Sequence, residues 1–379
     1  MNARERILAV LNHETPDKIP FTIYLETKYM VGLALYKPWR KLLDKGLGLH
    51  GAEVVQPYKV ICPNSKMEIT HHYGEVTSWS PVDILMAMNS THMVTGTIET
   101  PVGKINLKTK WQDLDLSSMI PWFPEDGYLV KNSEDYETLK YLIENTEYQP
   151  FYDDIKNFKM IIGNYGVIAA FVPKTPFQSM RMLMGPKTLA IEFYTNRKEF
   201  EDLYKLIYKK ELEIYKIAAE SPADFIWSPD NVTGQVTTPK FFEKFSLPFY
   251  NEVADIIHKH DKAYVVHMDG MLKSLRDLIP KTKIDAIESF TPPPVGDLPL
   301  KEAREFWKDK IIWANFPESV SLQGQKAVKE KTLEMLKDSA PGDNFLMGIS
   351  EGFPSTLHLF ASVPTILNVI NKHGTYPIS

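Results

Sequence analysis

The feature that most constrains the fold is a regular alternation of short apolar runs with helical patterns, which begins near residue 160. Segments with helical periodicity separate the later runs. Strands that alternate with helices form a parallel sheet whose faces the helices cover. The runs, rich in strand-forming residues, are YGVIAAF, ADFIWSP, AYVVHMD, IDAIESF, KIIWANF and NFLMGIS. The helical segments lie at 199–220, 239–260, 271–279, 299–307 and 327–339.

These units predict a closed (β/α)8 TIM barrel, because the chain before residue 160 can supply two further strands, IPFTIYL among them. A doubly wound open sheet is the alternative. No GxGxxG turn or GxxxxGK[ST] loop follows any of the runs, which weakens a nucleotide-binding interpretation.

The first half of the chain predicts an extension of this barrel. ARERILAVLN has the pattern of a first helix, and short β-rich pieces with turn residues between them fill residues 51–115. We therefore expect a single barrel domain over residues 1–379, with an N-terminal helical and antiparallel β extension and a β-rich insertion or cap at about 51–115.

Composition excludes several classes of protein. A hydrophobic content of 44% is enough for a large core, and a formal net charge of −5 gives no basic footprint for nucleic acid. No apolar run approaches the roughly 20 residues of a membrane span, and the N-terminus lacks a signal-peptide pattern. The single cysteine, Cys62, excludes a disulfide framework and a cysteine-cluster metal site. We expect a cytoplasmic protein.

Polar residues follow the later apolar runs at the points where the predicted strands end. In a parallel barrel all carboxyl ends of strands lie on one face, so these side chains converge on one mouth. A histidine with carboxylates at such a mouth is a candidate metal site, and without cysteines its ligands are nitrogen and oxygen only. The residues are Asp230, Asn231, His267, Asp269, Glu288, Asn315 and Glu351.

Structural explanations compete with this interpretation. His267 could be a hydrogen-bonded core histidine, and Asp269 could cap the helix predicted after it. Glu351 could accept amide hydrogen bonds at the start of the last helix, and Asp230 could belong to a simple turn. Glu288 lies within an apolar strand, where an unpaired carboxylate is costly, so it needs a metal, an arginine or a lysine as its partner.

Four segments together resemble the uroporphyrinogen decarboxylase-like superfamily, and within it the corrinoid-dependent methyltransferases, including the aromatic O-demethylase methyltransferases of anaerobic bacteria. They span most of the chain in a consistent order. The segments are RERILAVLNHETPDKIPF, VVHMDG, AIESFTPPPVGDLPLKEAR and MGISEGFPSTLHLF.

The resemblance implies a (β/α)8 barrel and a zinc site. Zinc methyltransferases of this kind hold the metal through a His-x-Cys pair and a later cysteine. His267 matches the histidine, Asp269 stands at the first cysteine position, and Glu351 falls close to the later one. Glu288 occupies the place of a glutamate ligand in the related cobalamin-independent methionine synthase. A set of nitrogen and oxygen ligands leaves zinc a harder Lewis acid, which suits an ether oxygen better than a thiol.

The function implied is O-demethylation, in which the methyl group of a methoxylated aromatic passes to the corrinoid of a separate partner protein. Zinc would be bound by His267, Glu288 and Glu351, with Asp269 as a fourth ligand or as a group that orients His267. Asp230 and Asn231 would hydrogen-bond the substrate or donate a proton. Residues expected to contact the substrate are Tyr24, Phe177, Met180, Arg181, Trp227, Phe290, Phe316 and Phe353.

Other functions are compatible with the same residues. The methyl donor could be methanol or a methylamine, or a methyl-corrinoid could donate to a thiol. A decarboxylase is a further alternative, but those enzymes carry an arginine-rich N-terminal segment, and here IPFTIYLETKYMVGLALYKPWR has no arginine before Arg40. A non-enzymatic binding protein is the third, because one barrel hosts many functions.

Overall fold

The computed structural model describes most of the chain. The described part divides into two compact units, a barrel unit (1–59, 149–175 and 212–379) and a second unit (60–148 and 176–211). Within it, no helix has the length and apolar character that crossing a membrane requires. The described residues are 1–24, 37–51, 55–72, 92–113, 119–122 and 127–378.

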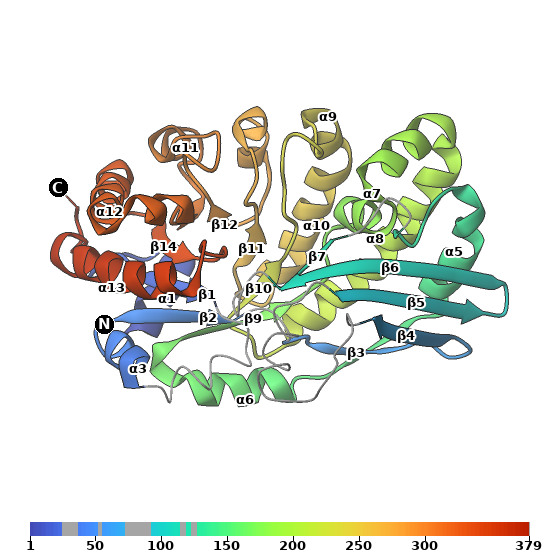
Figure 1. Ribbon diagram of the computed structural model, residues 1–379, viewed down its shortest axis with the longest axis horizontal. Coiled ribbons are helices and arrows are strands. Elements are labelled where there is room, and N and C mark those ends of the chain that lie inside the picture. Colours follow the sequence, from blue (N-terminus) through green and yellow to red (C-terminus); the bar gives the residue numbers. More distant parts are fainter. Residues whose placement is uncertain (25–36, 52–54, 73–91, 114–118, 123–126, 379) are drawn as a thin grey trace. The chain divides into compact units, whose positions relative to one another are not determined.

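Eight parallel strands close into a barrel, in the order β1-β14-β13-β12-β11-β10-β9-β2 (Figure 1). This confirms the predicted (β/α)8 architecture, and all six predicted runs are barrel strands. Nearly every strand residue is buried, as expected where a parallel sheet has helices on one side and a packed interior on the other. The strands are β1 (Phe21–Tyr24), β2 (Leu47–Gly51), β9 (Gly166–Phe171), β10 (Phe225–Ser228), β11 (Tyr264–His267), β12 (Ala286–Phe290), β13 (Ile311–Asn315) and β14 (Phe345–Ile349).

Helices follow most of these strands and cover the barrel (Figure 1). One prediction is wrong: residues 271–279 do not form a full helix but a 3-10 turn, η4 (Lys273–Leu275), followed by a second short turn. The helices of the barrel unit are α1 (Ala3–Leu11), α3 (Lys37–Leu43), α6 (Asp153–Ile162), α9 (Pro239–Phe241), α10 (Leu247–His258), α11 (Leu300–Phe306), α12 (Gln325–Ser339) and α13 (Thr356–His373), while α8 (Arg197–Glu220) begins in the second unit.

Helix α1 closes the amino-terminal end of the barrel. Its first turn is held by a capping box, in which Asn2 and Glu5 bond each other's backbone amides. Its apolar face joins the core cluster inside the barrel, through Ile7 among others. The Arg4 guanidinium bonds both carboxylate oxygens of Asp224, which lies just before β10, at 2.8 and 2.5 Å. The carboxyl end of the barrel is therefore the end available for a site.

The second unit contains a four-stranded antiparallel sheet in the order β4-β5-β6-β7. Strands β4 to β6 lie within residues 51–115, where β-rich pieces were predicted, and β7 lies after them. Its longest strands, β5 and β6, form a hairpin (Figure 1). At the turn, Thr100 at the end of β5 pairs with Gly103 at the start of β6. Strand β3 (Tyr58–Ile61) pairs with β8 (Glu147–Pro150) where the chain passes between the units. The unit's elements are β4 (Lys66–His72), β5 (His92–Thr100), β6 (Gly103–Asp113), β7 (Met119–Trp122), α5 (Tyr136–Glu144) and α7 (Pro176–Thr195).

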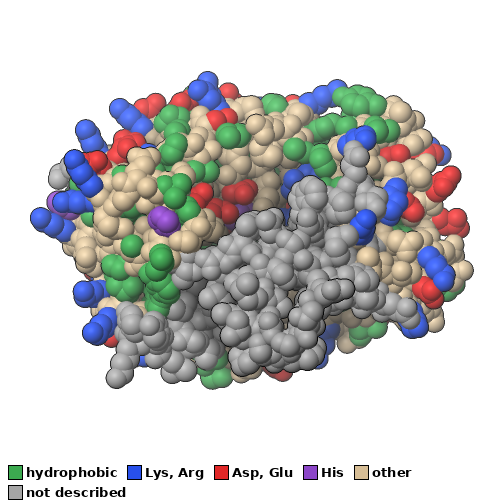
Figure 2. Space-filling view, in the orientation of Figure 1, with side chains coloured by type: hydrophobic (Ala, Val, Ile, Leu, Met, Phe, Trp, Pro, Cys, Tyr) green, Lys and Arg blue, Asp and Glu red, His purple; other side chains and the backbone are tan. Residues whose placement is uncertain are grey.

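Charged side chains of both signs are interspersed on the visible face. Figure 2 shows lysine and arginine side chains alternating with aspartate and glutamate side chains among the described residues of that face. This distribution agrees with the small net charge of the chain, −5.

Candidate functional site

Three potential metal ligands meet at the carboxyl end of the barrel. His267 is the last residue of β11, Asp269 follows it by two positions, and Glu351 follows the end of β14. The His267 Nε2 atom lies 3.3 Å from Glu351 Oε1 and 4.0 Å from Asp269 Oδ2. One ligand atom from each of the three residues lies within 4.8 Å of the others. One imidazole nitrogen and two carboxylate oxygens form a donor set that zinc accepts.

Glu288 lies on the opposite side of the His267 ring from the other two acids. Its Oε2 atom accepts a hydrogen bond from His267 Nδ1 at 2.6 Å and another from Trp227 Nε1 at 3.0 Å. A carboxylate on Nδ1 fixes the orientation of a metal-binding histidine and leaves Nε2 for the metal. The structure thus brings together the predicted residues, but it groups Asp269 with His267 and Glu351, and it places Glu288 behind the histidine.

Burial and the opposite charges of the two side chains govern the ionisation of His267 and Glu288. Burial favours the neutral form of Glu288, but the adjacent His267 outweighs it and holds the pKa of Glu288 far below its usual value. Burial also disfavours protonated His267, yet the charge and hydrogen bond of Glu288, with Glu351 nearby, raise the pKa of His267 well above its usual value. Burial raises the pKa of Asp269. Both shifts favour a charged pair, with His267 protonated and Glu288 ionised.

A bulge in β12 lets two successive residues serve the site. The register of β12 shifts between Glu288 and Phe290, and Ser289 between them has a positive φ of 61°. Successive side chains of a regular strand point to opposite faces. Here Glu288 contacts His267, while the Ser289 hydroxyl donates a hydrogen bond to Glu351 Oε1 at 2.8 Å. The bulge therefore links the strand to both sides of the cluster.

Asn315, at the end of β13, supports the same region. Its Oδ1 atom accepts a hydrogen bond from the backbone amide of Ser350 at 3.0 Å, directly before Glu351. Its amide nitrogen lies 3.2 Å from Thr291 Oγ1 and 3.3 Å from Glu318 Oε2. The predicted convergence of polar residues at the strand ends thus includes Asn315, which anchors the segment that carries Glu351.

The structural explanations for Asp269 and Glu351 do not apply. No helix begins directly after Asp269, because η4 starts only at Lys273 with Leu272 as its N-cap. The last helix, α13, is capped by Ser355, four residues beyond Glu351. Neither carboxylate therefore acts as the helix cap that could have accounted for its position.

Asp230 has a role in holding the loops that follow β9 and β10. Its carboxylate accepts hydrogen bonds from the Thr175 amide and hydroxyl, from Ser228 Oγ and from the Tyr250 hydroxyl, at 2.5 to 3.1 Å. These four donors match the acceptor capacity of a carboxylate, and Asp230 is fully buried. Asn231 is exposed, with a positive φ of 49°, and accepts a hydrogen bond from Lys174 at 3.0 Å. The geometry favours a structural role for Asp230 over the predicted catalytic one.

Among the predicted substrate contacts, Trp227 and Tyr24 lie beside the cluster. Their rings stack with centroids 5.9 Å apart, and the Trp227 ring meets the His267 ring edge-on at 5.5 Å. Phe290 instead packs against Trp307, at the end of α11, with centroids 5.5 Å apart. The bulge turns Phe290 toward the helix layer, and its predicted contact with a substrate stays a prediction.

The remaining predicted contacts have other surroundings. Phe316 and Phe353 are buried in the barrel unit. Phe177 and Met180 are fully buried in α7 of the second unit. Arg181, also in α7, donates from Nε to Gln178 Oε1 at 2.8 Å. The prediction that these five residues contact a substrate stays a prediction.

His50 is a site residue that the sequence did not reveal. It lies near the end of β2, is only 1% exposed, and places Nε2 at 3.7 Å from Glu288 Oε1. Its segment, LGLHG, contains two glycines and only two leucines, so it carries no strong strand signal. The available signal was the same as for the later strands: a short apolar run that ends in a polar residue.

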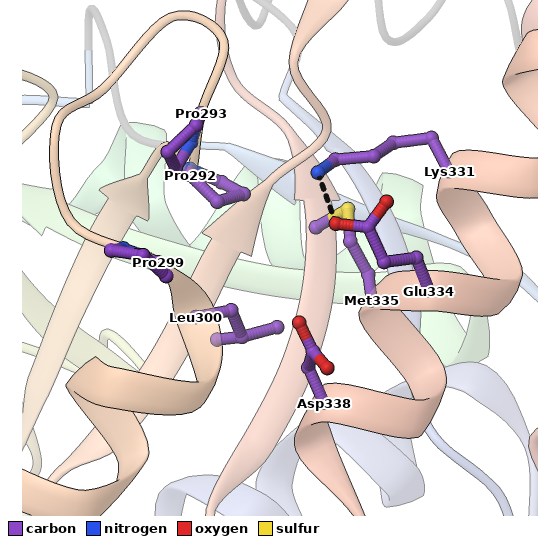
Figure 3. Close-up of a pocket in the computed structure, with 8 residues that line it drawn as sticks. All are labelled: Pro292, Pro293, Pro299, Leu300, Lys331, Glu334, Met335 and Asp338. Atoms are coloured by element: carbon purple, nitrogen blue, oxygen red, sulfur yellow. Dashed lines mark hydrogen bonds and ion pairs between the residues drawn. The ribbon is translucent and has the colours of Figure 1, made fainter.

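A separate pocket lies in the helix layer on the outside of the barrel, between the proline-rich loop after β12 and helices α11 and α12 (Figure 3). On the α12 side of this pocket, Lys331 Nζ pairs with Glu334 Oε1 at 2.7 Å (Figure 3). None of its lining residues belongs to the cluster around His267. They are Pro292, Pro293, Pro299, Leu300, Lys331, Glu334, Met335 and Asp338.

Comparison with protein families gives a match. The family model for uroporphyrinogen decarboxylase (URO-D) matches residues 121–359, which include β9 to β14 and the cluster of His267, Asp269 and Glu351. No curated protein matches the chain.

Proposed function

The chain belongs to the uroporphyrinogen decarboxylase family, and from this premise we propose that it is a zinc-dependent methyltransferase. It takes the methyl group of an O-methyl donor, such as a methoxylated aromatic, and transfers it to the corrinoid cofactor of a separate protein. The observation that carries the proposal is the cluster of His267, Asp269 and Glu351 at the carboxyl end of the barrel.

The residues present fit a zinc ion. His267 Nε2 and one oxygen each from Asp269 and Glu351 supply three ligands, the number found in catalytic zinc sites that keep one position open. Glu288 holds the other ring nitrogen, so it orients the histidine and is not assigned as a ligand. Asp269 thereby takes the place that Glu288 had in the predicted ligand set.

The ligand types indicate the donor. An ion held by nitrogen and oxygen alone supplies a hard Lewis acid, which polarises an ether or alcohol oxygen. The Trp227 ring lies beside His267 and the Tyr24 ring stacks on Trp227, so aromatic rings lie near the cluster, which suits a flat aromatic donor. The bulge residue Ser289 and Asn315 hold the segment of Glu351 in place.

The proposed reaction consumes the methyl donor, the reduced cobalt of the partner protein and one proton from the solvent. The bond between the methyl carbon and the ether oxygen breaks, and its electron pair stays on the oxygen. The methyl carbon forms its new bond with the electron pair of the reduced cobalt on the partner protein. The oxygen then takes up a proton and leaves as the phenol or alcohol.

Decarboxylation of an acidic tetrapyrrole is the second candidate, which the family match supports. Such a substrate needs several cationic side chains at the mouth. The arginines of the barrel unit are instead engaged elsewhere, in pairs with acidic side chains or with a backbone carbonyl. Those arginines are Arg4, Arg6, Arg40, Arg276 and Arg304. This observation favours methyl transfer.

Metal analysis of the purified protein tests the zinc site. We expect about one zinc per chain in the wild type and none in His267→Ala. Asp277→Asn is the matched control, because Asp277 is an exposed acid, 71% accessible, that lies outside the cluster. Wild-type protein without metal after reconstitution, or His267→Ala with full metal, would contradict the assignment.

Product analysis then tests the reaction. The zinc-loaded protein is mixed with a reduced corrinoid protein and a panel of methoxyaromatics, methanol and methylamines, and methyl-cobalt formation is followed by absorbance. We expect a signal with a methoxyaromatic. A signal with methanol or a methylamine alone would correct the donor, and carbon dioxide release from uroporphyrinogen would establish the decarboxylase instead.

A further inference from the structure

His50 presents an unusual buried environment. The side chain lies inside the barrel between two aromatic rings, with centroid distances of 5.4 Å to Tyr24 and 4.6 Å to Trp313. Neither of its ring nitrogens has a hydrogen-bond partner within the described part of the chain. Buried polar groups in proteins are almost always paired, so an unpaired one calls for a functional explanation.

The facing atom is unpaired as well. Glu288 Oε2 accepts two hydrogen bonds, from Trp227 and His267, whereas Glu288 Oε1 accepts none within the described residues. The described donor that faces Oε1 is His50, whose Nε2 lies 3.7 Å away. A buried carboxylate oxygen without a donor loses its hydration without compensation. His50 is thus the group placed to supply that donor.

We propose that His50 is a positioning residue that holds Glu288 Oε1 from across the barrel and thereby keeps His267 Nε2 turned toward the mouth. The three residues form a chain, His50–Glu288–His267, that begins on β2 and ends on β11. The positioning of His267 is independent of the metal, whereas its consequence for zinc affinity rests on the proposed function.

The surroundings of His50 support this role. Strand β2 is separated from β12 by β9, β10 and β11 in the barrel order, so the contact between His50 and Glu288 crosses the interior. Trp313, against which the His50 ring packs, is itself fixed by a hydrogen bond from its Nε1 to Thr22 Oγ1 at 3.0 Å. The imidazole therefore has little freedom to turn away from Glu288.

The neutral form of His50 suffices for this contact. Burial lowers the pKa of His50, against the opposing effect of Glu288, and a neutral imidazole still carries one N–H donor. A phenylalanine ring would keep the packing against Tyr24 and Trp313 but would remove the donor. A glutamine would keep an N–H donor at about the reach of Nε2.

The test compares His50→Phe, His50→Gln and His50→Asn. In protein labelled with ¹⁵N-histidine, the Nδ1–H resonance of His267 is assigned by its loss in His267→Ala. We expect this resonance to shift in His50→Phe and in the shorter His50→Asn, and to return to the wild-type position in His50→Gln. Zinc affinity, measured by chelator competition, should fall about tenfold in His50→Phe and stay within about threefold in His50→Gln.

Each outcome decides the proposal. An unchanged His267 resonance together with wild-type zinc affinity in His50→Phe overturns it. If His50→Phe does not fold, the contrast between His50→Gln and His50→Asn gives the same answer. If the wild type binds no zinc, the proposed function fails, and the His267 resonance of the metal-free proteins still decides the role of His50.

Discussion

At the scale of single residues, the site depends on which side of His267 each carboxylate occupies. Glu288 lies on the Nδ1 side at 2.6 Å, and Glu351 lies on the Nε2 side at 3.3 Å. Both are carboxylates near the same ring, but only Glu351, on the Nε2 side, belongs with Asp269 and His267 to the cluster of potential metal ligands. Glu288 can therefore orient the imidazole ring of His267 through Nδ1, while Nε2 of the same ring binds a metal together with Asp269 and Glu351.

Glu288→Gln separates these roles. The amide keeps the shape of the side chain but loses the charge that attracts the Nδ1 proton, so we expect His267 to be held less firmly. Zinc affinity should fall about 10- to 100-fold, the usual effect of removing a group that orients a metal-binding histidine. Equilibrium dialysis against a zinc buffer measures it.

The matched variant is Glu351→Gln, which removes a proposed ligand instead. We expect zinc affinity to fall further in Glu351→Gln than in Glu288→Gln. The reverse order would indicate that Glu288 coordinates the metal, as the sequence predicted, and that Glu351 does not.

At the scale of elements, strand β12 shows how a local irregularity shapes the site. Ser289 has a φ of 61°, in the left-handed region, where residues other than glycine are strained by roughly 1–2 kcal/mol. Its hydroxyl still bonds Glu351, which ties β12 to the segment after β14. The strained residue and the site coincide, as is common where backbone geometry serves function.

Two substitutions of Ser289 separate the effect of its strained backbone from the effect of its hydrogen bond to Glu351. Ser289→Gly accepts the positive φ but lacks the hydroxyl, so we expect a free energy of unfolding within about 1 kcal/mol of wild type and weaker zinc binding. Ser289→Val lacks the hydroxyl and adds a branched side chain, so it should destabilise the fold by more than about 1 kcal/mol. Urea unfolding gives both values. Equal free energies of unfolding for the two variants would contradict the claim that the positive φ of Ser289 strains the backbone.

The end of helix α10 is tied to the sheet by a pH-sensitive contact. His258 Nε2 lies 2.8 Å from Asp285 Oδ2, which also accepts the Tyr264 amide at the start of β11. The hydrogen bond to Asp285 raises the pKa of His258. Because the folded pKa exceeds the unfolded value, the contact stabilises the fold fully below about pH 6.5 and this stabilisation is lost as pH rises through the folded pKa.

His258→Gln should therefore lower the free energy of unfolding by less than about 1 kcal/mol near pH 5.5, since the side chain is 40% exposed. At pH 9 the variant and the wild type should unfold at nearly the same urea concentration. His260→Gln, at an exposed position on the same segment, is the control and should show no such difference. A constant difference at both pH values would exclude the charged contact.

The elements also show what the sequence could predict. The alternation of apolar runs with helical patterns identified β9 to β14, because each of these strands is a buried run with a helix or turn on either side. The apolar spacing of residues 271–279 predicts a helix, but the segment forms two short 3-10 turns, the second of which contains Pro280. The bulge at Ser289 was not predictable, since no residue type demands a positive φ there.

At the scale of the whole molecule, closure of the barrel decides which distant residues meet. Strand order follows the chain from β9 to β14, so convergence of the late polar residues was predictable from the fold. The approach of His50 to Glu288 was not, because it depends on β2 closing the other edge and on a contact across the interior. The sequence therefore predicts which late residues meet at the mouth of the barrel, but it does not predict that His50 approaches Glu288 in the interior.

Metal binding should consequently stabilise the molecule as a whole. Its proposed ligands come from the end of β11 and from the segments that follow β11 and β14. Two strands separate β11 from β14 in the barrel, and the unfolded chain does not hold these ligands together. At a free zinc concentration 100-fold above Kd, we expect about 2.7 kcal/mol of added stability, or roughly 3 °C in Tm for a chain of this length. Calorimetry of zinc-loaded and chelator-treated protein measures the shift.

The origin of that shift is decided by His267→Ala. If zinc acts through the cluster, His267→Ala should unfold at the same temperature with and without the metal, and near the Tm of metal-free wild type once the lost pairing with Glu288 is taken into account. An equal rise in Tm for both proteins would mean that zinc binds elsewhere on the chain. The fold and the family of the chain would be unaffected, but the cluster at the carboxyl end of the barrel would no longer explain the proposed zinc-dependent reaction.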